Sequence, residues 1–336
     1  MPRSLRWGLL GTARINRSLI PALRASPRNE LVAVASRDPG RAAAYAREWG
    51  IPHSYGRYED LLGDGKIDVV YNPLPNSLHA EWTIRAASAG KHVLCEKPLA
   101  VSVGEVDAIA AAARKAGVVV TEGLMYRHHA LTREVKAMVE GGTLGELRLV
   151  RGCFTFPVTR EPDFRLDPAL GGGCLWDLGV YPISYARLMI GTEPVEAFGW
   201  QTLGPTGVDV AFVAQLRFPA HLFLFPEDAF LQCDTSFRAA FRRNVEIVGS
   251  EATLVIPNPF KPGPSEFIHL VRTHERRTIT VAGTDAHLYL GEAEDLADAV
   301  LLGRPPAVSL ADSRGTVAAI VALLASAREG RPVKVG

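Results

Sequence analysis

The sequence predicts an α/β protein in two parts: a doubly wound parallel sheet followed by a domain with a large open, mostly antiparallel sheet. Up to about residue 125, short apolar runs alternate with helical segments, as in parallel βαβ units. From about residue 145, most segments have the alternating pattern of antiparallel strands. A chain of 336 residues is also long for one core. We therefore expect domains at 1–125 and 126–336, with the C-terminal helices able to pack back on the first.

Composition and charge are those of an ordinary soluble globular protein. The chain is 47% hydrophobic and 22% charged, with a net charge of +1 and no Lys/Arg block, which argues against a nucleic-acid partner. The cysteines, at 95, 153, 174 and 233, lack a CxxC spacing, which disfavours a metal site and favours a reducing compartment. Without an apolar signal region or a run near 18 apolar residues, we expect a cytoplasmic protein outside the membrane.

The first domain is expected to hold five strands with helices between them. The predicted strands are 5–10, 30–36, 68–71, 92–95 and 118–121, and the predicted helices are 13–25, 41–49, 77–89 and 102–116. Asp38 and Pro39 suit the N-cap and first position of the second helix.

The turn after the first strand reads Gly8-Leu9-Leu10-Gly11-Thr12-Ala13-Arg14-Ile15-Asn16. Against the dinucleotide fingerprint GxGxxG it keeps only the first glycine, Gly11, with Ala13 and Asn16 where the others would stand. Its place between a strand and a helix favours a pyrophosphate at the helix N-terminus, and the alternative is a glycine turn without a ligand.

The second strand ends in Ser36-Arg37, at the position that distinguishes the two nicotinamide cofactors. Arg37 can bind a 2'-phosphate as a fork of donors, so we predict NADP, with NAD as the alternative. Asp38 could approach a ribose but is better explained as a helix cap.

The fourth strand ends in Cys95-Glu96-Lys97-Pro98. A residue before proline is held in an extended or turn conformation, so Lys97 leaves the strand end at a fixed angle, and strand ends are where open α/β sheets bind ligands. The alternative is a solvated loop lysine. The loop Asn72-Pro73-Leu74-Pro75-Asn76-Ser77-Leu78-His79 is expected to pass over the same sheet end, with His79 packed or capping rather than catalytic.

The second domain is expected to contain seven strands and one interrupting helix before two final helices. The predicted strands are 146–156, 195–203, 208–218, 230–237, 244–248, 267–272 and 276–281; the helices are 175–189, 288–302 and 310–328. Asp177 and Tyr181 stand at i and i+4 and face one way, although a dipole-stabilising aspartate and a core tyrosine are the structural alternatives. An open sheet needs one face covered, so a homodimer or homotetramer through this sheet is expected.

Tyr126-Arg127-His128-His129 follow the fifth strand and bring four polar side chains to the sheet end. We do not expect a metal, because adjacent histidines diverge and no carboxylate stands at ligand spacing.

Together these motifs resemble the glucose-fructose oxidoreductase, inositol dehydrogenase and MocA (Gfo/Idh/MocA) family over nearly the whole chain. The matching residues are the 8–13 turn, Ser36-Arg37, Pro73 to His79, Glu96-Lys97-Pro98, Met125-Tyr126-Arg127, and Gly171-Gly172-Gly173 followed by Asp177-Leu178-Gly179-Val180-Tyr181. The resemblance implies an N-terminal Rossmann domain, a C-terminal α+β domain, and a substrate bound between them. Tyrosine at 181, where many members have histidine, resembles the branch of D-xylose dehydrogenase and dimeric dihydrodiol dehydrogenase.

The resemblance implies Lys97, Asp177 and Tyr181 as catalytic residues and Tyr126, Arg127, His128, Asp177 and Tyr181 as contacts to a sugar or polyol. The implied cofactor contacts are Gly11, Thr12, Ala13, Arg14, Ile15, Ser36, Arg37, Pro73, Leu74, Asn76, His79, Glu96 and Lys97. It also suggests a cis Lys97-Pro98 bond. One departure from the family pattern is a long apolar hairpin at 219–228, which leaves substrate and subunit contacts open.

Oxidation of a hydroxyl group requires a base, and Tyr181 is the candidate. A tyrosine has a reference pKa of about 10, and an ammonium about 4 Å away contributes roughly 4 kcal/mol at an effective dielectric near 20, or up to about three pKa units. Lys97 is therefore expected to activate Tyr181, with Asp177 orienting Lys97 or a substrate hydroxyl. The alternatives are Lys97 as the acid/base, a glucose-fructose-type oxidoreductase with tightly bound NADP, and a non-catalytic sugar sensor.

Overall fold

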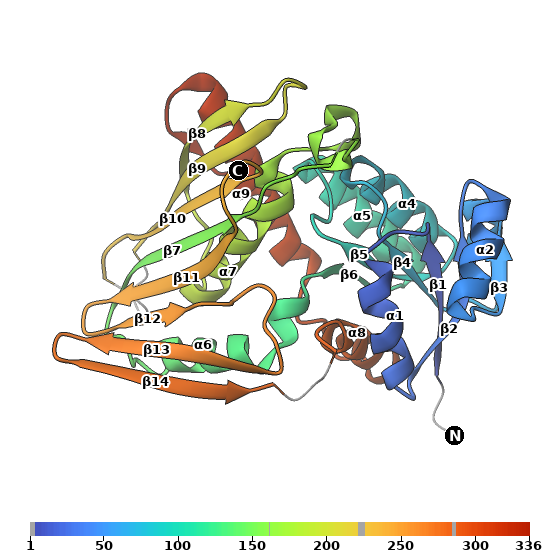
Figure 1. The fold of residues 1–336 in the computed structure, drawn as a ribbon, viewed down its shortest axis with the longest axis horizontal. Helices are drawn as coiled ribbons and strands as arrows, with labels where there is room; N and C mark the ends of the chain where they lie inside the picture. The colour runs from blue at the N-terminus through green and yellow to red at the C-terminus, as the bar shows by residue number, and fades with distance from the viewer. Residues whose placement is uncertain (1–3, 161, 221–225, 284–286) are drawn as a thin grey trace. The chain divides into compact units, whose positions relative to one another are not determined.

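The computed structural model describes residues 4–160, 162–220, 226–283 and 287–336 (Figure 1). They form two compact units: Met1–His128 with His287–Arg314, and His129–Ala286 with Gly315–Gly336. Residues 221–225 of the apolar hairpin noted in the sequence lie outside the described residues.

The first unit is built on a six-stranded parallel sheet with the order β3-β2-β1-β4-β5-β6. This is the order of a Rossmann fold, in which the sequence direction reverses between β1 and β4. Its elements are β1 (Leu5–Leu10), α1 (Asn16–Ala25), β2 (Asn29–Ala35), α2 (Pro39–Trp49), β3 (His53–Tyr55), α3 (Tyr58–Gly63), β4 (Val69–Asn72), α4 (Asn76–Ser88), β5 (His92–Glu96), α5 (Val103–Ala116), β6 (Val120–Gly123) and the 3₁₀ turn η1 (Met125–His128).

Local sequence explains where these helices begin and end. Asp38 caps α2 by accepting a hydrogen bond from the Arg41 amide at 3.0 Å, and Ser102 caps α5 in the same way. Gly50 and Gly117 end the same two helices in the left-handed conformation. The sequence patterns missed β3 and α3, because three and six residues are too short to show a hydrophobic period.

The chain returns to the first unit near its end. Helix α8 (Leu290–Leu302) packs against α1, η1 and β5. Arg28, just before β2, pairs with Glu294 at 3.0 Å and with Asp298 at 2.7 Å on this helix. Residues 266 and 270 positions apart in the sequence therefore lie side by side in one unit.

The second unit is built on a nine-stranded sheet with the order β14-β13-β12-β11-β7-β10-β9-β8-β15. All neighbouring strands are antiparallel except β7 and β10, which are parallel. The strands are β7 (Leu147–Thr155), β8 (Glu196–Leu203), β9 (Asp209–Phe218), β10 (Ala229–Ser236), β11 (Arg242–Gly249), β12 (Thr253–Ile256), β13 (Ser265–Arg272), β14 (Glu275–Ala282) and β15 (Val333–Lys334). The predicted class, a parallel α/β sheet followed by a mostly antiparallel one, is confirmed.

The two faces of this sheet differ. Along β9, Phe212 and Leu216 are buried, whereas Val213 between them is 50% exposed. Helices α6 (Ala130–Glu140) and α7 (Val180–Ile190) pack against strands of the sheet. The register puts Trp200 opposite Val213 on the other, open face, and Phe230 lies on the same face, four residues before the Val213 partner Asp234 on β10. The sequence patterns missed α6, β12 and β15.

The helix predicted at 175–189 is not a uniform α-helix. It opens with a π-helical turn, η4 (Leu175–Gly179), and continues as α7. Gly179 leaves room for the Leu175 side chain, because a Cβ at residue 179 would stand 2.6 Å from Leu175 Cδ1. π-Turns are rare and occur often at functional sites, and this one carries Asp177.

The last helix, α9 (Leu310–Glu329), is long and apolar enough to cross a membrane by length and composition alone. Half of its most apolar window is buried inside the protein.

Candidate functional site

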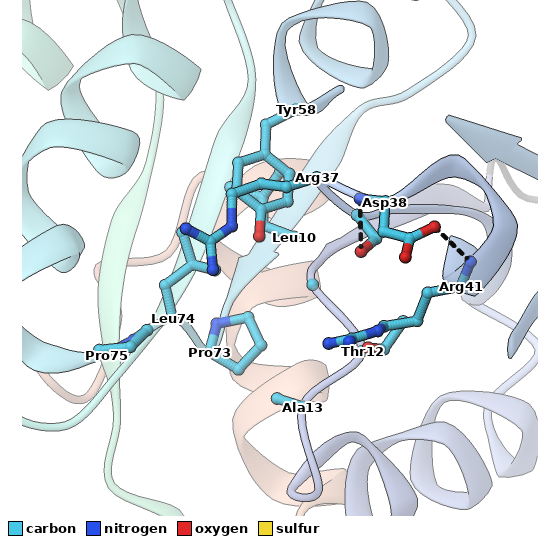
Figure 2. Close-up of a pocket in the computed structure, with 12 residues that line it drawn as sticks. Leu10, Thr12, Ala13, Arg37, Asp38, Arg41, Tyr58, Pro73, Leu74 and Pro75 are labelled. Atoms are coloured by element: carbon cyan, nitrogen blue, oxygen red, sulfur yellow. Dashed lines mark hydrogen bonds between the residues drawn. The ribbon is translucent and has the colours of Figure 1, made fainter. Parts of the chain in front are cut away.

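A cavity of about 520 Å³ lies at the carboxyl ends of β1, β2 and β4 (Figure 2). It is lined by Leu10, Gly11, Thr12, Ala13, Ser36, Arg37, Asp38, Arg41, Tyr58, Pro73, Leu74 and Pro75. Seven of these were predicted as cofactor contacts: Gly11, Thr12, Ala13, Ser36, Arg37, Pro73 and Leu74. Strand ends at the reversal point of an open α/β sheet are where such folds bind ligands.

The glycine turn forms the floor of this cavity. Gly11 has a φ of +90°, and a Cβ there would stand 3.3 Å from the Leu74 side chain and 3.6 Å from the Tyr58 hydroxyl. Asn16 closes the turn by donating from Nδ2 to the Gly11 carbonyl at 2.9 Å. No acidic residue stands in the first turn of α1, so the helix N-terminus suits an anion.

Two guanidinium groups, those of Arg37 and Arg41, point into the cavity (Figure 2). Ser36 precedes Arg37 at the end of β2, and its Oγ accepts a hydrogen bond from the Asp38 amide at 3.3 Å. Asp38 is the cap of α2, as predicted, so its carboxylate is committed to the helix. A site with two arginines and a serine favours a phosphate over a bare ribose hydroxyl.

Arg41 and Tyr58 were not identified from the sequence. Arg41 lies one turn into α2, where it resembles an ordinary surface arginine, and only the cap at Asp38 brings that turn to the strand end. Tyr58 begins the short helix α3. Burial raises the pKa of Tyr58, and the nearby charges of Arg37 and Arg41 oppose that shift.

His79 connects two loops and does not line the cavity wall. It is 1% exposed, and its ring nitrogens lie 2.7 Å from the Pro98 carbonyl oxygen and 2.6 Å from the Leu74 carbonyl oxygen. Burial lowers the pKa of His79 to about 4, while the carbonyl contacts act in the other direction. The packed histidine anticipated from the sequence is thus observed, and a direct contact between His79 and a cofactor would require this buried ring to be uncovered.

Lys97 follows β5, is partly buried, and precedes a cis peptide bond to Pro98, as expected. Glu96 accepts a hydrogen bond from the Tyr71 hydroxyl at 2.5 Å, and its other oxygen lies 3.3 Å from the Lys97 amide. The remaining predicted cofactor contacts, Arg14, Ile15 and Asn76, lie at the starts of α1 and α4.

The polar residues after β6 make contacts with other residues of the first unit. Tyr126 is fully buried. Arg127 pairs with Asp312 at 3.0 Å, and the arginine side chain is 9% exposed. The His128 side chain lies so close to Gly291 that a Cβ at that glycine would stand 2.5 Å from it. Arg127 thus has a structural role besides any contact with a substrate.

In the second unit, Tyr181 lies in an aromatic cluster over the covered face of the sheet. Its ring centroid is 5.3 Å from that of Phe154 and 5.5 Å from that of Phe260, and the residue is 3% exposed. These contacts leave the ring little freedom and hold its hydroxyl in one direction.

Asp177, four residues earlier, pairs with Arg165, whose Nε lies 2.8 Å from Asp177 Oδ2. Arg165 also binds Asp163 at 3.2 Å and lies 4.5 Å from the ring centroid of Phe164. Arg165 was not identified from the sequence, because a loop arginine beside two aspartates looks like an ordinary surface residue. Asp163 in turn lines a cavity of about 830 Å³ in the same unit.

Glycines bring the Arg165 loop against the π-turn. A Cβ at Gly172 would stand 2.5 Å from the Arg165 carbonyl oxygen and 2.8 Å from that of Asp167, so a side chain there is excluded. Beside it, Asp209 Oδ2 accepts a hydrogen bond from the Leu175 amide at 2.7 Å and satisfies the start of the turn. The glycine run predicted to precede a helix therefore also positions the loop that pairs with Asp177.

Among the residues that the structure describes, no three His, Cys, Asp or Glu side chains gather in a way that could hold a metal ion. The four cysteines are free and buried.

Comparison with known proteins follows the same division of the chain. Residues 5–124 match a family model described as the oxidoreductase family with an NAD-binding Rossmann fold, and residues 132–255 match the GFO/IDH/MocA C-terminal domain. The chain is 36% identical to D-xylose 1-dehydrogenase (NADP(+)) 2 of Haloferax volcanii, over 98% of this chain and 100% of that protein.

Two solved structures are similar over almost the whole chain. The first, KijD10, a 3-ketoreductase from Actinomadura kijaniata in complex with NADP and TDP-benzene, has a TM-score of 0.89 and 31% identity, covering 96% of this chain and 98% of that one. The second, an aldose-aldose oxidoreductase from Caulobacter crescentus complexed with glycerol, has a TM-score of 0.90 and 29% identity, covering 99% and 100%.

Proposed function

The chain belongs to the GFO/IDH/MocA oxidoreductase family, and we propose that it is an NADP(H)-dependent oxidoreductase acting on a hydroxyl or carbonyl group of a sugar, polyol or related substrate. The observation that carries the proposal is the cavity at the strand ends, where Ser36, Arg37 and Arg41 lie together. The relative from Haloferax volcanii and the ketoreductase from Actinomadura kijaniata support it, since NADP stands in the name of the first and in the complex of the second.

In this proposal residues 1–125 bind NADP, and residues 126–336 bind the substrate and a second subunit. The turn from Gly11 to Ile15 holds the pyrophosphate at the start of α1. Ser36 and the two arginines hold the 2'-phosphate. Pro73, Leu74, Asn76, Glu96 and Lys97 form the rest of the cofactor site, and His79 contributes by tying the loop at Leu74 to Pro98.

When bound, NADP(H) would supply the hydride acceptor for the carbon that carries the hydroxyl group, or the hydride donor for a carbonyl carbon. The hydroxyl proton passes to Tyr181, and the charge of Lys97 favours the phenolate. Asp177 orients Lys97 or a substrate hydroxyl, while Tyr126, Arg127 and His128 contribute to substrate binding. The alternative assignment makes Lys97 the group that takes the proton and Tyr181 a hydrogen-bond donor to the substrate.

The test is a panel of aldoses, inositols and trans-dihydrodiols, each with NADP and with NAD, followed by the absorbance of reduced nicotinamide. We expect turnover with a sugar and a preference for NADP. Turnover measured with the Lys97→Ala protein, purified in the same way, gives the background activity of any contaminating dehydrogenase. If no substrate in the panel reacts while NADPH still binds in a fluorescence titration, the non-catalytic sensor becomes the better explanation.

A second candidate is an oxidoreductase that keeps its NADP bound and transfers hydride between two sugars, and the similarity to the aldose-aldose oxidoreductase favours it. Protein purified without added nucleotide distinguishes the two enzymes. Nucleotide absorbance that survives gel filtration, together with turnover of paired aldoses without added NADP, supports this second candidate. Nucleotide-free protein that needs added NADP supports the first.

We also propose a homodimer or homotetramer through the open face of the second sheet. Trp200 and Phe230 are 58% and 43% exposed there, and Arg151 lies beside Glu246, so the same patch on two copies can pair apolar and charged groups. Light scattering should give the mass of at least a dimer, and Trp200→Asp should shift the protein toward the monomer. A wild-type monomer at micromolar concentration would reject this proposal.

The buried free cysteines suit the reducing cytoplasm, where we place the enzyme.

A further inference from the structure

A buried acid lies close to the residue before Lys97. Glu292, on α8, is 1% exposed, and no described residue donates a hydrogen bond to either of its carboxyl oxygens. An ionised carboxylate in such a place would lose its hydration without compensation, which costs several kcal/mol. A surface helix of a soluble protein has no structural need for an acid on its buried side.

The carboxyl group of Glu292 reaches the ends of β5 and β6. The point where a Cβ would stand on Gly123 is 3.5 Å from Glu292 Oε2, 3.4 Å from the Cys95 carbonyl oxygen and 3.7 Å from the Glu96 Cα. Because residue 123 is a glycine, no side chain there competes with the Glu292 carboxyl group for this space. Two carboxyl groups that share a buried site do not both ionise, because like charges repel strongly in a low dielectric.

The groups around the two acids show which of them keeps the charge. Glu96 has the Tyr71 hydroxyl as a donor at 2.5 Å and the Lys97 amide nearby, so its carboxylate form is stabilised. Burial, and then the charge of Glu96, raise the pKa of Glu292 well above its ordinary value. Burial, and then the charge of Glu96, also raise the pKa of Tyr289, at the start of α8.

Glu122 on β6 and His128 on η1 are further titratable residues near this site. Glu122 on β6 is engaged by the Leu99 amide at 2.9 Å and the Ser313 hydroxyl at 2.6 Å. His128 on η1 packs against Gly291. The pKa of Glu292 is raised by its burial and by the charge of Glu96.

We propose that Glu292 is a positioning residue that stays protonated and donates a hydrogen bond to the carboxylate of Glu96, so that one negative charge, held in one place, stands beside Lys97. This deepens the proposed function, on which it rests, because that charge lies at the strand end assigned to the cofactor. A fixed carboxylate there favours the cationic oxidised nicotinamide over the neutral reduced one. Glu292 acts through Glu96 and touches neither substrate nor cofactor.

Three variants on α8 test this proposal. Glu292→Leu keeps the approximate size but removes the donor, Glu292→Gln keeps a donor without an ionisable group, and Glu294→Gln removes an acid from the side of the helix that faces Arg28. In the leucine variant, Glu96 takes up a proton more readily, so the acidic limb of the pH profile of kcat/KM moves upward by about one unit or more and NADP loses about tenfold in affinity relative to NADPH. The Glu292→Gln variant restores both properties, and the Glu294→Gln variant changes neither.

A purely structural role predicts a different result, in which the leucine variant weakens NADP and NADPH binding equally and leaves the pH limb in place. That result, or a Glu292→Gln variant as impaired as the leucine variant, overturns the proposal. Infrared spectroscopy tests the proton directly and needs no turnover: the carbonyl band of a protonated carboxylic acid should be present in the wild type at about pH 8 and absent in Glu292→Gln.

Absence of that band in the wild type also overturns the proposal, even if the leucine variant does not fold. If the band and the binding ratio behave as expected but the substrate panel shows no turnover, the proposed function fails and the role of Glu292 stands.

Discussion

Arg165 donates a hydrogen bond from Nε to Oδ2 of Asp177 across 2.8 Å, joining a loop to the π-turn that begins the central helix of the second unit. The Asp177 side chain is 9% exposed and that of Arg165 29%, so the pair is only partly screened by water. A carboxylate this buried needs a nearby cation or donors to stay ionised. Arg165 thus compensates the buried charge of Asp177 and restricts its orientation before any substrate arrives.

Replacing Arg165 with methionine should lower the free energy of unfolding by about 1 to 3 kcal/mol, because it leaves a mostly buried carboxylate without this partner. It should also lower kcat/KM, since Asp177 loses its fixed orientation. Urea denaturation measures the first effect. The matched control is Arg314→Met, whose pair with Asp107 is 43% and 56% exposed and should contribute less than about 1 kcal/mol. Equal losses in the two variants would contradict this account of the pair.

Replacing Arg37 or Arg41 with alanine should weaken NADPH binding about ten- to a hundredfold. A charge-assisted hydrogen bond to phosphate contributes about 1.5 to 3 kcal/mol, and each 1.4 kcal/mol is about tenfold in affinity. NADH, which has no 2'-phosphate, should bind each variant as it binds the wild type. Fluorescence titration with both nucleotides measures this selectivity. The control is Arg47→Ala, which changes an exposed arginine of α2 that does not line the cavity and should leave the binding of both nucleotides unchanged. If an Arg37 or Arg41 variant lost affinity for NADPH and NADH equally, that would argue against a 2'-phosphate site.

Lys97→Ala should lower kcat by about 10² to 10⁴-fold, the usual contribution of acid–base catalysis, while most of the NADP affinity survives, because the proposed contacts to the pyrophosphate and the 2'-phosphate remain. Tyr181→Phe should have a loss of the same order, because the phenyl ring keeps the contacts with Phe154 and Phe260 but loses the hydroxyl. If Lys97 acts through Tyr181, the double variant should lose little more than either single one. Additive losses would favour separate roles, and near wild-type turnover of the lysine variant would reject the mechanism. Lys115→Ala, at the exposed end of α5, is the control.

Glu292→Gln should stabilise the protein, and increasingly so as pH rises. The native state holds a proton on Glu292 above the ordinary carboxyl pKa, whereas the unfolded chain releases it. The wild type therefore loses stability with rising pH, by up to about 1.4 kcal/mol per unit, until the native pKa is reached. Glutamine does not ionise, so its advantage in denaturation midpoint should be larger at about pH 8 than at about pH 5. A difference that is flat with pH would contradict a protonated Glu292, and Glu294→Gln serves as the control on the same helix.

Most of the first unit was predictable, because it repeats one local pattern. The strand that precedes Gly11 and the cap at Asp38 are each signalled within a few residues, and both occur as predicted. The short elements β3 and α3 escaped detection because they fit the fold only through their neighbours. The amphipathic helix at 130–140 was also missed, although its hydrophobic period is present in the sequence.

The sequence by itself determined the family, the order of the two sheets and the Ser36-Arg37 signal for a phosphate, since these depend on short motifs and periodic burial. The tertiary structure decided which distant residues complete each site. Arg41 reaches the cavity because Asp38 caps its helix, Arg165 meets Asp177 because Gly172 lets the loop approach, and Glu292 lies beside Glu96 because α8 returns to the first unit. A sequence pattern records which face of an element is apolar, but not which charged residue from elsewhere in the chain will be buried against it.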